Sequence, residues 1–149
     1  MTHHKTSLLW RREKEDFSYA AYDRSHTWTS EGGVVVPASA APTYRGTPDR
    51  MNPEEAFVGA LSSCHMLTFL ALCSREGLVV DSYEDNAMGV MEKADDGKMW
   101  VSRVVLHPRV AFAPTATVTP EKLQDLHHRA HQECFVARSV KTAVTVEYG

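Results

Sequence analysis

The sequence predicts an α+β fold whose sheet is mostly antiparallel. Five strand-like segments and two helical segments follow one another in the order strand, strand, helix, strand, strand, helix, strand. Because strands and helices do not alternate one by one, parallel pairing through crossover helices is not expected. The chain has 149 residues, of which 43% are hydrophobic. It can therefore bury one proper core, and we predict a single domain over residues 1–149.

The first predicted element is an antiparallel hairpin over residues 17–36. Aromatic or apolar residues alternate there with polar ones, and Glu31, Gly32 and Gly33 mark the turn. Residues 37–51 contain three prolines and a glycine without a sustained period, so we expect a surface loop. Loops of this kind often line functional sites.

A long helix is predicted to follow this loop. Asn52 is a favourable N-cap, Pro53 suits the first helical position, and two glutamates lie in the first turn, where the helix dipole favours carboxylates. The helix is expected to end near Gly77 and to span about 36 Å over roughly 24 residues. Residues 56–72 are apolar on nearly every face, which indicates a helix covered on all sides, and a partner subunit could supply some of this cover.

The second half of the chain repeats this order with a hairpin, a helix and a strand. The hairpin is predicted from residues 83–92 and 99–112, on either side of a turn at residues 94–98. Thr119 and Pro120 open a second helix that continues to about Cys134. Alternating residues from Val140 to Tyr148 predict a final strand.

Charge and hydropathy exclude several classes of partner. The net charge is −3, and the basic residues are scattered among the acidic ones, so no nucleic-acid partner is expected. The N-terminal segment lacks the apolar region of a signal peptide, and no run is expected to approach the roughly 20 apolar residues of a membrane span. We therefore expect a soluble, cytoplasmic protein without a membrane partner.

Three cysteines are available for chemistry. Cys64, Cys73 and Cys134 do not form the dense disulfide framework of small secreted domains. A cysteine in an apolar helix, as Cys64 is, more often packs than reacts. Cys73 lies nine residues further along the helix, on a different face, and packing is its expected role.

The sequence around two of these cysteines resembles the OsmC/Ohr family of peroxidases. The resemblance covers nearly the whole chain and rests on two motifs in order, Asn52-Pro53-Glu54-Glu55 followed by Ala60-Leu61-Ser62-Ser63-Cys64-His65, and Ala130-His131-Gln132-Glu133-Cys134-Phe135-Val136. The family pairs an N/S-P-E motif with a cysteine ten residues past the glutamate, and it has a second cysteine sixty to seventy residues later. Both spacings occur here.

The resemblance implies an intertwined homodimer in which sheets wrap two long central helices. It implies a thiol-dependent peroxidase that reduces organic hydroperoxides, with hydrogen peroxide as a further candidate, and that acts in oxidative-stress defence. Cys64 would become a sulfenic acid and then form a disulfide with Cys134. An external dithiol, a lipoyl group being one candidate, would reduce that disulfide, and no cofactor is expected.

A buried thiolate needs a nearby cation, because burial raises the pKa of a thiol. The resemblance assigns this role to Arg24, on an early strand, with Arg45 as the alternative, and it makes Glu54 the carboxylate that holds the guanidinium. On one straight helix, ten residues separate Glu54 from Cys64 by about 15 Å. We therefore expect the carboxylate that serves one Cys64 to come from the other subunit.

Two other classes of function remain open. His127 and His131 have the i, i+4 spacing of zinc ligands, and Cys134 lies three residues further on, so a His/Cys metal-binding protein is conceivable, although solvated histidines are favoured and no metal site is predicted. Alternatively, a non-catalytic dimer of this kind binds a small apolar ligand between its helices. His65, next to Cys64, is expected to be a buried or interface residue, since it points about 100° away around the helix.

Overall fold

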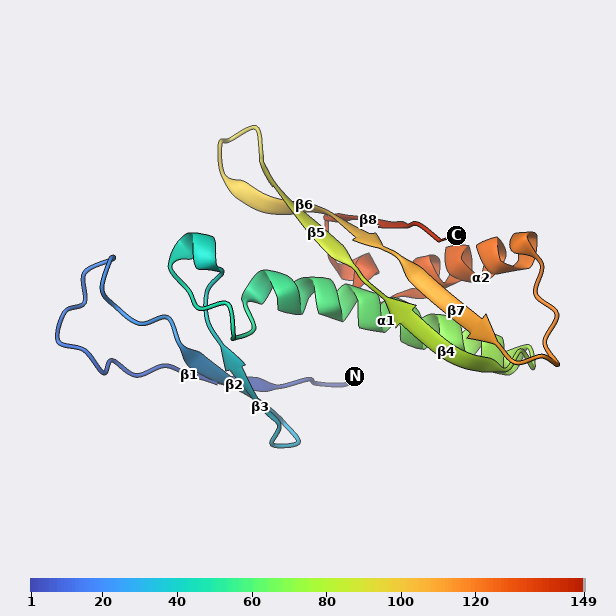
Figure 1. Ribbon diagram of the computed structural model, residues 1–149, viewed down its shortest axis with the longest axis horizontal. Coiled ribbons are helices and arrows are strands. Elements are labelled where there is room, and N and C mark those ends of the chain that lie inside the picture. Colours follow the sequence, from blue (N-terminus) through green and yellow to red (C-terminus); the bar gives the residue numbers. More distant parts are fainter. Residues whose placement is uncertain (149) are drawn as a thin grey trace. The chain divides into compact units, whose positions relative to one another are not determined.

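The computed structural model describes residues 1–148 and shows the predicted mixture of two α-helices and mostly antiparallel strands (Figure 1). The chain divides into two compact units, residues 1–56 and residues 57 onward, and each is described by itself. The prediction of a single domain over residues 1–149 stays a prediction.

The first unit contains a three-stranded antiparallel sheet in the order β1-β2-β3. Its strands are β1 (Thr6–Leu9), β2 (His26–Ser30) and β3 (Val35–Ala38). The predicted turn between β2 and β3 is confirmed, and Gly33 adopts a φ of 88° there, which suits glycine. The expected strand over residues 17–25 is wrong, because these residues form a loop, and β1 was not predicted. The loop after β3 includes the short helix η1 (Pro42–Tyr44).

Helix α1 (Pro53–Arg75) begins and ends as its sequence predicts. The Glu55 backbone N–H donates to Asn52 Oδ1 at 2.8 Å, and the Asn52 N–H donates to Glu55 Oε2 at 3.1 Å, which together form a capping box. At the other end, Gly77 has a φ of 70°, and the N–H of Leu78 donates to the Cys73 carbonyl at 2.9 Å. This is a Schellman arrangement, which satisfies the last carbonyls of the helix.

The second hairpin is bent, so that each predicted long strand is divided into two. Its strands are β4 (Val80–Asp85), β5 (Met88–Lys93), β6 (Met99–Leu106) and β7 (Pro108–Phe112), with β4 paired to β7 and β5 paired to β6. The bend is held by Asp85, whose carboxylate accepts a hydrogen bond from the His107 backbone N–H at 2.7 Å. The last strand, β8 (Ala143–Val146), pairs in parallel with β6.

Helix α2 (Pro120–Glu133) starts at the predicted N-cap. The Thr119 hydroxyl accepts a hydrogen bond from the Lys122 backbone N–H at 3.1 Å. The helix ends at Cys134, whose backbone is already extended, and a short helix, η2 (Ala137–Ser139), leads to β8. Cys134 therefore lies at a sharp change of chain direction, as the sequence predicts.

Two apolar clusters form the core of the second unit. One joins α1 to α2 and to strands β4 and β7, and its buried members are Phe69, Leu72, Cys73, Leu126 and Ala130. The other joins α1 to β6, with partly buried residues of β8 and of the chain after α2 around it, and its buried members are Leu61, Val104 and Leu106. Both helices thus pack on the bent hairpin, which crosses α1 in Figure 1.

Helix α1 is too apolar for a helix with one face exposed to water. Among the described residues it is the one helix long and apolar enough to cross a membrane, with a mean hydropathy of 1.7 over 18 residues, so the expectation that no run approaches such a length was wrong. Buried helices of soluble proteins have the same composition. Yet only 28% of that window is buried within this chain, so the predicted cover on all sides is not supplied by the chain itself.

Candidate active site around Cys64

The structure brings Cys64 and Cys134 together, although seventy residues separate them in the sequence. Cys64 lies half-buried on α1, and Cys134 lies buried at the C-terminal end of α2. Cys64 lies close enough to Cys134 to raise the pKa of the Cys134 thiol, which supports the expectation that the two helices meet at these positions. All three cysteines are free thiols in the structure.

Cys134 is held as a protonated thiol. Burial raises the pKa of Cys134, the N–H groups of Ala137 and Val136 act against it, and the neighbouring Cys64 raises it further. The Ala137 N–H donates to the Cys134 sulfur at 3.5 Å. Because the thiolate is the attacking form in disulfide formation, Cys134 must release this proton when it reacts.

An open groove of about 490 Å³ runs past Cys64 between α1 and the chain that follows α2. Its apolar wall includes Leu67, Ala71 and Phe135, and the side chains of Leu67 and Phe135 are 60% and 81% exposed. A peroxide can therefore reach the Cys64 sulfur along an apolar surface.

Three charged residues also line the groove, namely Arg75, Glu133 and Arg138. No salt bridge within residues 1–148 involves any of them. The sequence analysis missed both arginines. Arg75 is on α1, three helical turns after Cys64, so helical spacing could have placed it on the same side, whereas Arg138 follows an irregular segment whose path no sequence pattern reveals.

Arg24 lies in the first unit, two residues before β2 rather than on a strand as expected. Its guanidinium donates to the carbonyls of Tyr22 at 2.5 Å and Tyr19 at 2.6 Å, and it lies 3.6 Å from the centre of the Tyr22 ring. The side chain is buried within a group of aromatic residues, Trp10, Phe17, Tyr19 and Tyr22. Arg24 is therefore a fixed cation whose position is set by its own loop.

Glu54 and Glu55 share the first turn of α1 but differ in their hydrogen bonds. Glu55 is used in the capping box, whereas Glu54 has a buried Oε2 atom that is without a partner among the described residues. Arg24 and Glu54 form no ion pair within the described part of this chain. Arg45, the alternative cation, is exposed and has a φ of 65° at the end of η1.

About 100° around α1 from Cys64, a buried pair of histidines joins the two helices. His65 Nε2 and His127 Nδ1 are 3.0 Å apart, and both residues are almost fully buried. Burial lowers the pKa of His65 to about 4, with the charge of His131 as the next cause, and burial followed by the charge of His65 lowers the pKa of His127 to about 4. Both rings are therefore neutral at pH 7, and the expectation that His65 is a buried residue is confirmed.

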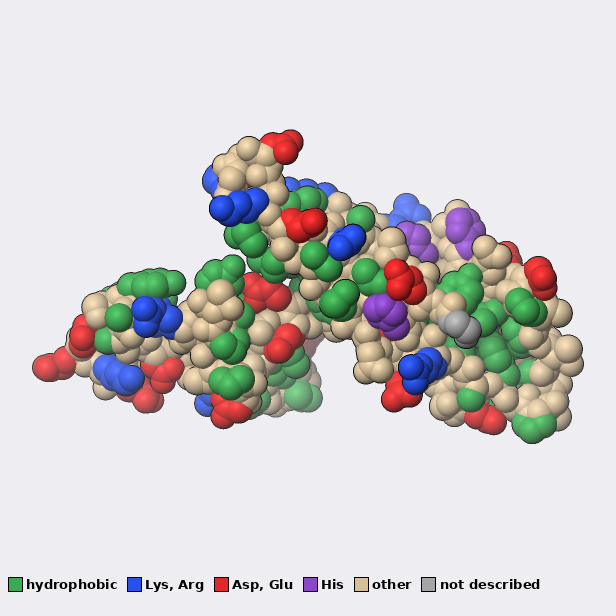
Figure 2. Space-filling view, turned by 45° about the horizontal axis from the view of Figure 1, so that its top comes forward, with side chains coloured by type: hydrophobic (Ala, Val, Ile, Leu, Met, Phe, Trp, Pro, Cys, Tyr) green, Lys and Arg blue, Asp and Glu red, His purple; other side chains and the backbone are tan. Residues whose placement is uncertain are grey.

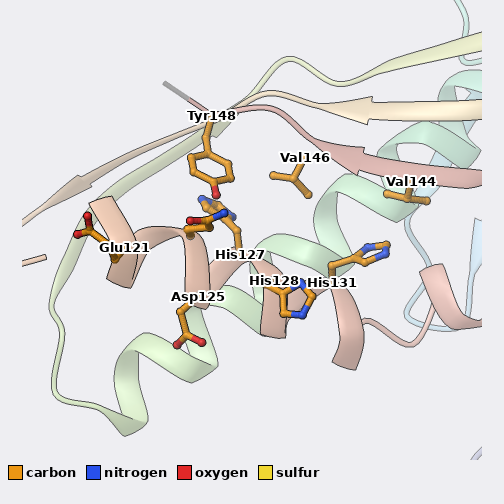
Figure 3. A pocket seen from close by; sticks show the side chains of 9 residues that line it. Glu121, Asp125, His127, His128, His131, Val144, Val146 and Tyr148 are labelled. Carbon is orange, nitrogen blue, oxygen red and sulfur yellow. The ribbon is translucent and has the colours of Figure 1, made fainter. Parts of the chain in front are cut away.

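A second cavity, of about 480 Å³, lies between α2 and β8 and does not include the cysteines. Figure 3 shows His127 beneath Tyr148, while His128, His131, Glu121 and Asp125 project from α2 around them. Figure 2 shows histidine side chains reaching the surface of the second unit. No group of three or more His, Cys, Asp or Glu in residues 1–148 is arranged to hold a metal ion, and this includes His131 with Cys134.

Cys73 is only 1% exposed and belongs to the core cluster between the helices. Burial raises the pKa of Cys73, and the Glu76 carboxylate raises it further. The expected packing role agrees with this position.

Comparison with known proteins gives one family. The family model described as OsmC-like protein matches residues 46–149. An OsmC-like protein of unknown function from Vibrio cholerae O1 biovar eltor str. N16961 has a solved structure that is 43% identical, covers 100% of both chains and has a TM-score of 0.95.

More distant proteins are similar in structure or in sequence. The organic hydroperoxide resistance protein OhrB of Bacillus subtilis is 19% identical over 99% of this chain and 98% of its own, with a TM-score of 0.71. The Bacillus subtilis protein YmaD is 22% identical over 127 residues, which is 84% of each chain.

Proposed function

We propose, from the premise that this chain belongs to the OsmC-like protein family, that it is a thiol-dependent peroxidase that reduces organic hydroperoxides in oxidative-stress defence. The observation that carries the proposal is the pairing of Cys64 with Cys134 beside an open groove. A half-buried thiol, a buried partner thiol beside it and an apolar approach are the parts that such a reaction needs. The likeness to OhrB is a likeness of fold, and it adds a precedent for peroxide chemistry on that fold.

The proposed reaction begins when the Cys64 thiolate attacks the terminal oxygen of the hydroperoxide. The O–O bond breaks, an S–O bond forms, and the alkoxide takes the proton that the thiol released, which yields an alcohol and a Cys64 sulfenic acid. Cys134 then attacks the Cys64 sulfur, an S–S bond forms, and the sulfenic oxygen leaves as water with the Cys134 proton. An external dithiol restores both thiols by exchange and is itself oxidised to a disulfide.

We further propose that the protein acts as a homodimer with two-chain sites. Support comes from α1, which is apolar along most of its length and yet mostly uncovered within one chain. Glu54 and Cys64 are about 15 Å apart along this unbroken helix. Arg24, held by Glu54 from the partner subunit, would be the cation that stabilises the thiolate.

The test is a dithiol-coupled assay of peroxide consumption with cumene hydroperoxide and hydrogen peroxide, followed by mass spectrometry of the cysteines. Cys64→Ser should lose all turnover. Cys134→Ser should form a sulfenic acid that dimedone traps but no disulfide, and Cys73→Ser is the matched control that keeps activity. Turnover by Cys64→Ser at the wild-type rate would refute the proposal.

The two-chain site is tested by mixing chains. Homodimers of Glu54→Ala and of Cys64→Ser should each be inactive, and mixed dimers should regain part of the activity, because one of their two sites is intact. Folded mixed dimers without activity would contradict the shared site while leaving the chemistry of Cys64 unaffected.

A further inference from the structure

The chain makes one closed turn directly after α2, and Cys134 is its first residue. The Cys134 carbonyl accepts a hydrogen bond from the Arg138 N–H at 3.0 Å, and the Cys134 sulfur accepts one from the Ala137 N–H at 3.5 Å. Cys134 has the extended backbone of a helix N-cap, with a φ of −66° and a ψ of 113°. Its sulfur therefore takes the place of a capping oxygen, and the direction in which the sulfur points is coupled to the geometry of the turn.

Ser139 closes this turn at its other end. Its backbone N–H donates to the Val136 carbonyl at 3.0 Å, and its hydroxyl donates to the Phe135 carbonyl at 2.7 Å. Serine hydroxyls commonly bond in this way to the carbonyl four residues earlier. The hydroxyl thus ties the end of the turn to the residue that directly follows Cys134. All the hydrogen bonds of the turn join residues at most four positions apart in one chain, so they do not depend on which surface a second copy of the chain covers.

We infer that Ser139 is a positioning residue for disulfide formation, because its hydroxyl holds the turn from which the Cys134 sulfur attacks Cys64. The inference rests on the proposed peroxidase function and names a residue that controls its second step. In that step the S–O bond of the Cys64 sulfenic acid breaks and the Cys64–Cys134 S–S bond forms, while the OH group leaves as water with the proton of Cys134.

The narrow geometry of a disulfide explains why the turn matters. A disulfide forms over a small range of Cα–Cα and Cβ–Cβ distances, and a misplacement of about 1 Å can slow a reaction by about 100-fold. Cys64 is fixed within the unbroken helix α1, so the adjustment has to come from Cys134. Without the Ser139 hydroxyl the turn has one hydrogen bond fewer and adopts more arrangements, of which a smaller share places the Cys134 sulfur against Cys64.

The first experiment follows the two steps separately in Cys73→Ser protein, the parent of all variants, in which Cys64 and Cys134 are the remaining thiols. Cumene hydroperoxide is added in equal amount, samples are quenched at timed intervals with dimedone and an alkylating agent, and mass spectrometry measures the sulfenic acid and the disulfide. Ser139→Ala should leave the rate of sulfenic acid formation unchanged and should slow disulfide formation at least about fivefold. Ser139→Thr keeps the hydroxyl and should restore most of the parent rate.

Thr142→Val is the matched control. The Thr142 hydroxyl donates to the Val101 carbonyl at 2.8 Å, so it anchors the same connection between α2 and β8 but lies outside the turn of Cys134. Its loss should leave the rate of disulfide formation unchanged. Equal slowing by Thr142→Val and Ser139→Ala would mean a general loosening of the connection and would overturn the inference. The parent rate in Ser139→Ala, or no rescue in Ser139→Thr, would overturn it as well.

A second measurement separates this inference from the peroxidase proposal, because it needs no peroxide. Ellman's reagent converts Cys64 to a mixed disulfide with 5-thio-2-nitrobenzoate. Attack by Cys134 then breaks that bond, forms the Cys64–Cys134 disulfide and releases a second coloured thiolate, and the Cys134→Ser variant, which stops at the mixed disulfide, identifies this release. Ser139→Ala should slow the second release at least about fivefold relative to the parent and to Thr142→Val.

The outcomes of this second measurement are distinct. No second release in the parent, or equal rates in the parent and Ser139→Ala, would contradict the positioning role of Ser139. Slower release in Ser139→Ala, together with no sulfenic acid from any peroxide, would instead refute the peroxidase function and retain that role.

Discussion

Cys64 and His65 are neighbours on α1, yet their side chains lie in opposite surroundings. Cys64 borders an open groove with charged residues that have no ionic partner among the described residues, whereas His65 is enclosed between the helices and hydrogen-bonded to His127. Successive residues of a helix point about 100° apart, so one helix can present a reactive face and a structural face. The apolar composition of α1 therefore serves two purposes. The face that carries His65 packs in the core between the helices, and the face that carries Cys64 leaves the thiol accessible.

The largest expected effect on the free energy of unfolding comes from a cavity in the buried face of α1. Phe69 is fully buried and contacts Tyr83, Phe112 and His127, so Phe69→Ala should lower the free energy of unfolding by about 3–5 kcal/mol. Leu67→Ala, on the groove face two residues away, is the matched control. Urea unfolding measures both, and an equally large loss for Leu67→Ala would mean that a partner subunit covers the groove face.

Low pH should also destabilise the buried face of α1, where His65 and His127 lie. The pKa values of His65 and His127 are about 4 in the folded chain and about 6.5 when unfolded, so between these values the unfolded chain binds more protons. The contribution to stability is complete above pH 6.5 and is lost as the pH falls toward 4, on the order of 3 kcal/mol for each histidine. Urea unfolding at a series of pH values measures this loss. The slope should be shallower in His127→Gln than in the control His128→Gln, and equal slopes would contradict the role of the pair.

Alkylation compares the accessibility of the cysteines directly. Cys64 should react with iodoacetamide at least about tenfold faster than Cys73, because Cys73 is 1% exposed and its pKa is raised by burial. Mass spectrometry of tryptic peptides after timed quenching gives the two rates. If Cys73 reacted as fast as Cys64, the two faces of α1 would not differ as described.

The smallest expected effect concerns the start of α2, far along that helix from Cys134. Thr119→Ala removes the cap on the Lys122 N–H and should lower the free energy of unfolding by about 1 kcal/mol. Thr119→Ser keeps the hydroxyl and should cost less. Disulfide formation between Cys64 and Cys134 should be unchanged in both, and a slower rate in Thr119→Ala alone would show that the pairing of the cysteines depends on the whole helix.

Local signals predicted those parts of the fold that depend on neighbouring residues. Asn52, Pro53 and Gly77 marked the ends of α1, and Thr119 marked the start of α2, because capping is decided within one turn. The bend in the second hairpin was missed, since it depends on a hydrogen bond between Asp85 and His107, which are 22 residues apart.

The site was predictable only in part for the same reason. Motif spacing identified Cys64 and Cys134, which the structure brings together, and it proposed Arg24 and Glu54, whose part in the site stays a prediction. Arg75 and Arg138 line the same groove through tertiary packing, for which the sequence carries no local pattern. The His65–His127 pair likewise joins two helices that are distant in sequence, so burial of each histidine could be expected but not their contact.

The packing of Arg24 has an entropic consequence. An exposed arginine that becomes ordered in a complex loses up to about 2 kcal/mol of rotamer freedom. Arg24 has already lost that freedom, because two carbonyls and the faces of two tyrosine rings fix its guanidinium when the loop folds. An anion that meets Arg24 therefore gains a charge-assisted contact without an ordering cost for the arginine, whereas Arg75 and Arg138, which have no ionic partner among the described residues, must still be ordered by whatever they bind.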